Sequence, residues 1–167
     1  MAQVIQERWA QATVDFESFY RAQYPQIYRA AFLATSDSDL ALDATQEAFK
    51  KAYARWRRLQ RHEWAGGWVM TTTLNLCKRM GSRAARERAS DVSAETHIGG
   101  PRPDRVDVSK ALATLPARQR MATILFYIGD LPLDAIAYLM GVSEGTVKAH
   151  LAQARASLRD ALEVRDV

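Results

Sequence analysis

The stretch Leu131–Leu162, LPLDAIAYLMGVSEGTVKAHLAQARASLRDAL, decides the fold of the second half of the chain. It predicts two helices joined by a tight turn. Gly141 suits the turn because it lacks a Cβ atom, and Ser143 suits the N-cap of the second helix. Apolar residues then recur every three or four positions and predict one buried face; they are Val147, Leu151, Ala154, Leu158 and Leu162. This pattern is typical of a helix-turn-helix.

The residues outside that apolar stripe suit contact with duplex DNA. A helix-turn-helix lays its second helix in the major groove, with the N-terminal half on the base edges. The candidate contacts are small, polar or basic: Ser143, Thr146, Lys148, Ala149, His150, Gln153 and Arg155. The alternative is a plain helical hairpin, but the agreement of turn, cap and stripe favours the DNA-binding motif.

Composition sets the outer bounds. A chain of 167 residues is long enough for one domain or two small ones, and 23 Lys+Arg against 19 Asp+Glu mildly favours a polyanionic partner. The single cysteine, Cys77, excludes an internal disulfide and fits a reducing compartment. No segment resembles a signal peptide or approaches the roughly 20 apolar residues of a membrane span. We therefore expect a soluble cytoplasmic protein without membrane insertion.

Two helices are predicted in the first part of the chain. Asp15–Thr35 carries aromatic residues at helical spacing, which is typical of a core face, and Pro25 predicts a kink there or a break just before it. The capping cluster at residues 36–39 begins a second helix that reaches about Arg58. Its predicted apolar side holds Leu40, Ala44, Ala48, Ala52, Tyr53 and Trp56.

The other face of this second helix begins acidic or amide and turns basic. Asp43, Gln46 and Glu47 come first, and Lys50 follows. This order suits the helix dipole, so the face is consistent with a well-solvated stable helix. It is also organised enough to serve as a protein-docking surface.

Residues 50–88 hold most of the excess positive charge. They include a break at 60–67 and a third helix predicted over residues 68–88, with Val69, Thr72, Leu76 and Met80 on its buried side. Basic side chains bind phosphates, and aromatic faces stack on unpaired bases. This composition therefore indicates a surface for single-stranded or melted DNA. Its candidate residues are Arg57, Arg58, Arg61, Trp64, Asn75, Lys78, Arg79 and Arg83. For Trp64, a core position and a stacking position remain equally open.

A polar segment, residues 89–107, predicts a flexible linker because it is rich in Ser, Gly, Pro and charge. A short helix over 108–115 and another over 117–128 then lead into the helix-turn-helix. Arg118 and Arg120, at the start of the latter, are candidate phosphate contacts. The predicted fold class is all-α: a tail (1–14), a helical domain (15–88), the linker, and a helix-turn-helix domain (108–167).

No constellation for catalysis is present in the sequence. There is no Gly-rich phosphate loop, no Cys–His pair and no carboxylate set with metal spacing, and the three histidines fall in three different segments. We therefore expect a protein that is not an enzyme and that carries neither a cofactor nor a metal.

Five short motifs, in order, resemble those of bacterial RNA polymerase sigma factors of the extracytoplasmic-function (ECF) type, in the sigma-70 family. In the first domain, residues 43–49 (DATQEAF) resemble D-x-T-Q-E-x-F, and Trp68 with Asn75 resembles W-L…R-N. In the second, residues 111–120 resemble A-L-x-x-L-P-x-x-q-R, residues 145–148 (GTVK) resemble G-T-V-K, and residues 154–158 resemble A-R-x-x-L. The resemblance covers about Asp15 to Leu162.

The resemblance implies a function for each domain. The first domain would bind core RNA polymerase through Asp43, Gln46 and Glu47, with Phe49 and Lys50 beside them, and would capture the −10 promoter element as a melted strand. The second domain would read the −35 element as duplex. The resemblance also implies a monomer and sequestration by an anti-sigma factor.

The chain departs from the family pattern at two places. Family members often carry Ser-Arg after the Lys and a further Arg before Ala-Arg, where this chain has Ala149, His150 and Gln153. Since Gln suits adenine better than guanine, we expect a shifted −35 preference. Residues 71–74 (TTTL) stand where the family often shows R-I-A-R, so one basic contact is missing at Leu74. DNA melting would then be weaker, or would depend more on promoter sequence.

Two other function classes fit parts of the sequence. A dimeric helix-turn-helix regulator would use its first domain to sense a ligand or partner and would bind an operator without polymerase. Its first domain would need an apolar pocket, where this chain is basic. A protein–protein adaptor built on helical hairpins leaves the basic and aromatic cluster unexplained.

Overall fold

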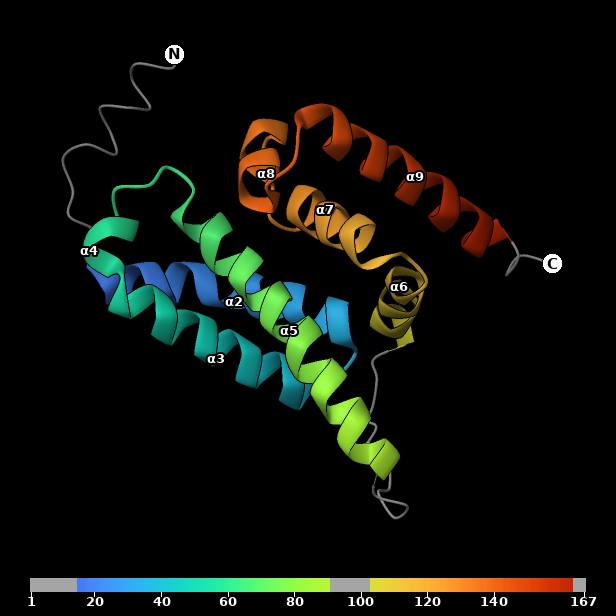
Figure 1. Ribbon diagram of the computed structural model, residues 1–167, viewed down its shortest axis with the longest axis horizontal. Helices are drawn as coiled ribbons and strands as arrows, with labels where there is room; N and C mark the ends of the chain where they lie inside the picture. Colours follow the sequence, from blue (N-terminus) through green and yellow to red (C-terminus); the bar gives the residue numbers. More distant parts are fainter. Residues whose placement is uncertain (1–14, 91–102, 164–167) are drawn as a thin grey trace.

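A computed structural model describes residues 15–90 and 103–163 of the chain, with side chains described over 15–90 and 108–161. All regular structure in these ranges is helical, in agreement with the all-α prediction (Figure 1). The helices are α2 (Phe16–Thr35), α3 (Ser38–Ala54), α4 (Trp56–Leu59), α5 (Ala65–Ser90), α6 (Pro103–Ala113), α7 (Ala117–Tyr127), α8 (Leu133–Met140) and α9 (Glu144–Glu163). The predicted tail lies outside the described residues.

Helices α2, α3 and α5 pack together as a first module. The carboxylate of Asp15 caps α2 by accepting from the Ser18 backbone N–H, which also lowers the pKa of Asp15. Asp37 caps α3 by accepting from the backbone N–H groups of Asp39 and Leu40, both at 3.0 Å. Helix α2 continues through Pro25, so the break that the sequence allowed does not occur.

Aromatic rings fill the space between the start of α2 and the end of α3. The Trp56 ring lies 4.7 Å from that of Phe19, and the Phe49 ring lies 4.7 Å from that of Tyr20, centroid to centroid. The aromatic stripe of α2 therefore serves the core, as predicted. Tyr53, predicted on the apolar side of α3, is instead 67% exposed, because it lies at the open edge of this cluster.

Two boundaries of the first module differ from the prediction. The second predicted helix ends at Ala54, and α4 follows as a separate turn. Helix α5 begins at Ala65 rather than at residue 68. The two glycines that indicated a break therefore lie inside the first turn of this helix. Gly67 is buried there, and its lack of a side chain leaves room for a close neighbour.

The second module consists of α6 to α9, and its helix-turn-helix has the predicted local chemistry. Gly141 adopts a left-handed conformation (φ 66°), and its backbone N–H closes the end of α8. The Ser143 hydroxyl accepts from the backbone N–H of Thr146 at 3.1 Å and caps α9. Val147, Leu151 and Ala154 are buried as predicted, and the side chain of Leu162 lies outside the described residues.

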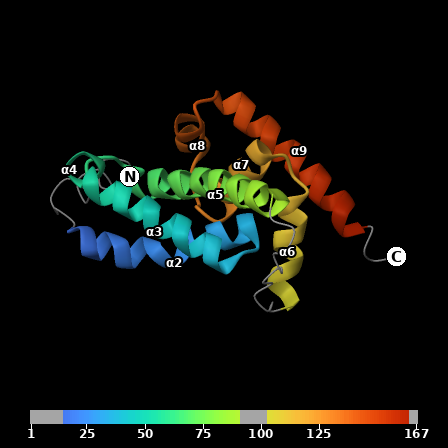
Figure 2. The ribbon, with the colours of Figure 1, turned by 60° about the horizontal axis from the view of Figure 1, so that its bottom comes forward.

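The two modules pack directly against each other, along a seam between α5 and the α7–α8 hairpin and through a second contact between α2 and α6 (Figures 1 and 2). A Cβ atom on Gly67 would lie 2.9 Å from Leu139 Cδ1 and 3.0 Å from Leu131 Cδ1, and one on Gly129 would lie 3.0 Å from Met70 Sδ. The Gln26 side-chain amide donates to the Ile128 carbonyl across the same junction. The sequence predicts two domains joined by a flexible linker, and nothing in it indicates that they pack against each other along this seam.

Candidate nucleic-acid interface

Helix α9 presents a small, exposed face over its first three turns. Gly145, Ala149 and Gln153 recur at a spacing of four residues, so they share one side of the helix, and all three are exposed. Lys148 is exposed beside them. A helix of 10–12 Å diameter fits the major groove of B-DNA, which is about 12 Å wide, and small residues let its backbone approach the bases closely.

Four other residues that were predicted to contact DNA are hydrogen-bonded or partly buried within the protein. The Ser143 and Thr146 hydroxyls lie 2.9 Å apart, so both contribute to the cap. His150 is half-buried, and its Nδ1 atom is inaccessible to solvent. Arg155 is exposed and donates to the Tyr127 hydroxyl at 3.4 Å.

The two arginines at the start of α7 have different environments. Arg118 is exposed, which suits a phosphate contact. Arg120 is half-buried, and its guanidinium donates to three backbone carbonyls: Leu115 at 3.0 Å, Ala113 at 3.1 Å and Ala34 at 3.4 Å. Arg120 therefore joins the turn before α7 to the end of α2, and a phosphate contact at this residue stays a prediction, one that would need the guanidinium to leave these carbonyls.

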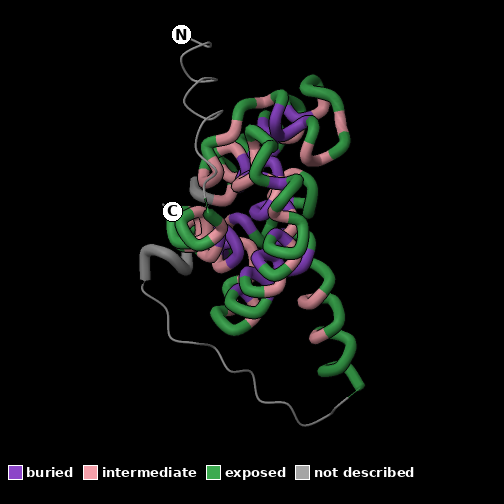
Figure 3. Tube along the Cα trace, turned by 90° about the vertical axis from the view of Figure 1, so that its left-hand side faces the viewer, coloured by how far each residue is buried: buried purple, intermediate pink, exposed green. Residues whose placement is uncertain are grey.

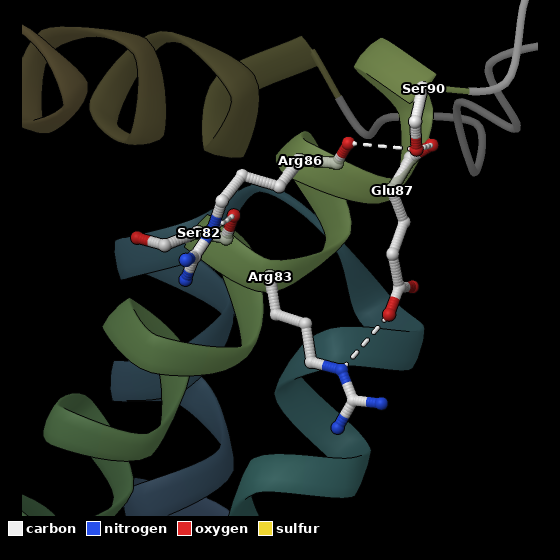
Figure 4. A network of polar contacts seen from close by, with 5 residues as sticks. All are labelled: Ser82, Arg83, Arg86, Glu87 and Ser90. Carbon is white, nitrogen blue, oxygen red and sulfur yellow. Dashed lines mark hydrogen bonds and ion pairs between the residues drawn. The ribbon is translucent and has the colours of Figure 1, made fainter.

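The last turns of α5 form an exposed basic rod that projects from the body of the molecule (Figures 1 and 3). Lys78 and Arg79 are exposed, and Arg83 pairs with Glu87 at 2.9 Å on the surface (Figure 4). Arg86 also lies here, with its Nε 3.3 Å from the Ser82 carbonyl. An exposed pair of this kind contributes little to stability, so the rod stays available for phosphates.

The region before α5 brings the predicted bases and one tryptophan together. Arg57, Arg58 and Arg61 are exposed. Trp64 is half-buried, with its ring centroid 5.9 Å from that of Tyr138 on α8. Trp64 is thus covered from the second module, a contact between residues too distant in sequence for any local pattern to indicate.

A groove of about 600 Å³ lies where the two modules meet. Its floor includes Thr71, Leu74 and Cys77 of α5, and its rim includes Asn75 and Lys78. Leu74, which the sequence placed at a missing DNA contact, is only 5% exposed. Burial raises the pKa of the Cys77 thiol to about 12.

The outer face of α3 carries the residues predicted to dock a protein. Asp43, Gln46 and Lys50 are exposed, and Glu47 is half-exposed, 3.6 Å from Lys51 Nζ. Phe49 is different because it is 3% exposed and packs inside the aromatic cluster. The prediction of Phe49 as a docking residue is therefore corrected: it supports the face from behind.

Neither a metal site nor a membrane span is found among the described residues. Within residues 15–90 and 103–163, no three His, Cys, Asp or Glu side chains gather as metal ligands would. No helix in the same ranges has the length and hydropathy needed to cross a membrane. What the structure offers is a set of polar and basic surfaces.

Two protein families match the chain, one on each module. The family described as Sigma-70 region 2 matches residues 19–87, and the one described as Sigma-70, region 4, matches residues 105–158. The chain belongs to the sigma-70 family. Both regions of this sigma factor match in the order that its sequence motifs indicated.

Individual relatives place this sigma factor in the ECF group. It is 29% identical over 150 residues to the ECF RNA polymerase sigma factor SigM of Mycobacterium tuberculosis, covering 86% of this chain and 74% of SigM. It is 25% identical over 163 residues to the RNA polymerase sigma-E factor of Streptomyces coelicolor, covering 92% of this chain and 89% of that protein.

Solved structures resemble the sigma factor over nearly its whole length. The sigma factor RpoE of Bartonella quintana, in complex with the anti-sigma factor NepR, matches with a TM-score of 0.74 and 25% identity, over 90% of this chain and 98% of that one. CnrH, in complex with the cytosolic domain of CnrY, matches with a TM-score of 0.70 and 17% identity, over 95% and 94% of the two chains, and so supports the fold.

Proposed function

We propose that this sigma factor binds core RNA polymerase and directs transcription from promoters that carry its −10 and −35 elements. The observation that carries the proposal is the pairing, in one chain, of the two sigma-70 regions, each with its predicted contact face exposed. Such a factor recognises DNA for the polymerase and catalyses no reaction itself. It acts where the polymerase is, in the cytoplasm.

Each surface has a role in this proposal. Asp43, Gln46 and Lys50 on α3 dock the polymerase. The basic residues around the start of α5 and along its projecting end hold the melted −10 strand, through charge on the phosphates and stacking on Trp64. The exposed face of α9 reads the −35 duplex, with Arg118 on a phosphate.

A protein partner that holds the sigma factor inactive is a further part of the proposal. The Bartonella relative was solved with an anti-sigma factor, and its fold matches this chain across both modules. We extend this assembly to the present chain, as a complex of one sigma factor with one anti-sigma factor. Without either partner, the protein is a monomer.

Run-off transcription tests the proposal directly. Core RNA polymerase from the same organism is assayed on genomic fragments, with and without the purified full-length protein. Discrete new start sites that require the protein are the expected result, and the aligned sites reveal both promoter elements. The proposal would be overturned if the protein left transcription by the polymerase unchanged and bound duplex DNA as a dimer in a mobility-shift assay. The protein would then be an operator-binding regulator.

A matched pair of variants tests the docking face. Asp43→Lys reverses an exposed charge on α3, and we expect it to reduce the transcripts at least tenfold by weakening the binding of core polymerase. Glu17→Lys reverses an exposed charge on α2, outside the predicted motif, and serves as the control. Equal loss from both variants would count against the assignment of the α3 face.

A further inference from the structure

One side chain of the α9 reading face is held by a neighbouring helix. Gln119, in the first turn of α7, donates its Nε2–H to Gln153 Oε1 at 2.9 Å. The Gln119 backbone is itself fixed, because its carbonyl accepts from the Thr123 hydroxyl at 2.8 Å. Gln119 is half-buried, whereas Gln153 is exposed on the same face as Gly145 and Ala149.

This contact determines which end of the Gln153 amide is available to DNA. An amide has a donor end (NH₂) and an acceptor end (C=O). Because Oε1 faces Gln119, the NH₂ group is the end left for a base edge. A two-bond contact with adenine needs both ends on the base. A donor alone suits a base edge with acceptors only, which guanine presents at N7 and O6 and thymine at O4, whereas adenine presents one acceptor, N7, beside its own amino donor.

We propose that Gln119 is a positioning residue that fixes the amide of Gln153 and so sets the base preference at one −35 position. The preference is for a base that presents acceptors, guanine or thymine, rather than the adenine that the sequence of α9 alone indicated. Gln119 acts through Gln153 and does not itself touch the DNA. This inference rests on the proposed function, in which α9 reads duplex DNA.

Two polar atoms near this contact are inaccessible to solvent. Gln119 Oε1 and His150 Nδ1 are both shielded from solvent, and neither has a hydrogen-bond partner among the described residues. Gln119 therefore anchors part of its amide inside the α7–α9 junction. His150 lies one turn before Gln153 on α9, so its inaccessible Nδ1 atom lies near this part of the reading face.

Two substitutions of Gln119 are expected to change the base preference in different ways. Gln119→Glu is nearly isosteric, but a carboxylate only accepts, so it would draw the NH₂ end of Gln153 inward and turn Oε1 toward the DNA. The preference should then move toward adenine or cytosine, which present an amino donor, by about fivefold or more. Gln119→Ala removes the constraint and should flatten the preference without reversing it.

The experiment uses the full-length protein with core polymerase on a promoter library randomised across the −35 element. Base preferences are compared for the wild type, Gln119→Glu, Gln119→Ala, Gln153→Ala and the double variants. In the Gln153→Ala background, the Gln119 substitutions should no longer move any preference, because the residue that they act through is gone. Arg118→Ala is the matched control, and it should weaken all promoters alike.

Each outcome has a clear meaning. Loss of transcription from every promoter alike, with an unchanged order of bases and a lower melting temperature, would show that Gln119 only stabilises the module and would overturn the inference. A shift that persists with Ala at position 153 would also overturn it, since Gln119 would then contact DNA itself. If the wild type gives no promoter-specific transcript, the proposed function fails. If the wild type has a preference that the Gln119 variants keep, this inference alone fails.

Discussion

At the scale of single residues, Asp37 controls the start of α3 and, with it, the placement of the docking face. Its carboxylate accepts from two backbone N–H groups that no other group of the helix can satisfy. We expect Asp37→Ala to lower the free energy of unfolding by about 1 kcal/mol. Thermal unfolding measures the change, and Asp37→Asn, which keeps a capping oxygen, should restore most of it.

Cys77 provides a second test at the same scale. Burial raises the pKa of its thiol to about 12. The thiol should therefore stay protonated and resist a thiol-specific reagent at pH 8 until the protein unfolds. Rapid labelling of the folded protein at that pH would contradict the observed burial.

The sign of the pH effect follows from the same shift. The pKa of the thiol is higher in the folded state than its ordinary value of 9.0, so the folded protein holds the proton more tightly. Its contribution to stability is full below about pH 9 and is lost as the pH rises toward 12. Cys77→Ser, which does not titrate in this range, should show a smaller loss between these pH values in denaturant unfolding.

At the scale of elements, Arg118 and Arg120 have opposite roles on one helical turn. Arg120→Ala removes charged hydrogen bonds to carbonyls of two modules, so we expect a destabilisation of about 1.5–3 kcal/mol. Arg118→Ala, on the exposed side, should leave stability within about 0.5 kcal/mol of the wild type. Chemical denaturation of the two variants measures the difference, and equal effects would contradict it.

The elements also show what local sequence can and cannot predict. The helix-turn-helix was predictable because Gly141, Ser143 and the apolar stripe act within a few residues of one another. The start of α5 was not, because Gly66 and Gly67 have low helix propensity, and their place in the helix depends on side chains from the rest of the fold.

The residues of the candidate site also differ in whether the local sequence predicts their environment. Exposed positions such as Lys148, Asn75 and Asp43 followed from the faces of their helices. Burial of Phe49 and the carbonyl contacts of Arg120 depend on helices that are distant in sequence, and so does the contact between Gln119 and Gln153. No periodicity within one helix carries information about such partners.

At the scale of the whole molecule, the packed arrangement is too small to contact both promoter elements. The two elements are about 25 base pairs apart, or about 85 Å at 3.4 Å per base pair. A compact chain of 167 residues has a radius of gyration of about 15 Å. The modules must therefore separate along the α5 seam when the sigma factor binds a promoter.

A substitution in the seam tests this separation. Gly67→Val would place methyl groups against Leu131 and Leu139, so we expect the modules to part and the radius of gyration of the free protein to rise, as measured by small-angle X-ray scattering. Gly81→Ala, on the same helix, meets only Leu40 at an ordinary 3.6 Å and should leave the radius unchanged. Equal radii for both variants would mean that Gly67 does not control the seam.

The seam also has a consequence for synthesis on the ribosome. Gly67 of α5 lies against Leu131, which is translated about 65 residues later. At about 5–20 residues per second, the nascent chain exposes the side of α5 that faces the second module for about 3–13 s before the second module covers it. A product truncated in the linker would keep this side bare permanently, and the time between translation of the two halves is therefore the period in which the protein is most exposed to aggregation or to capture by a chaperone.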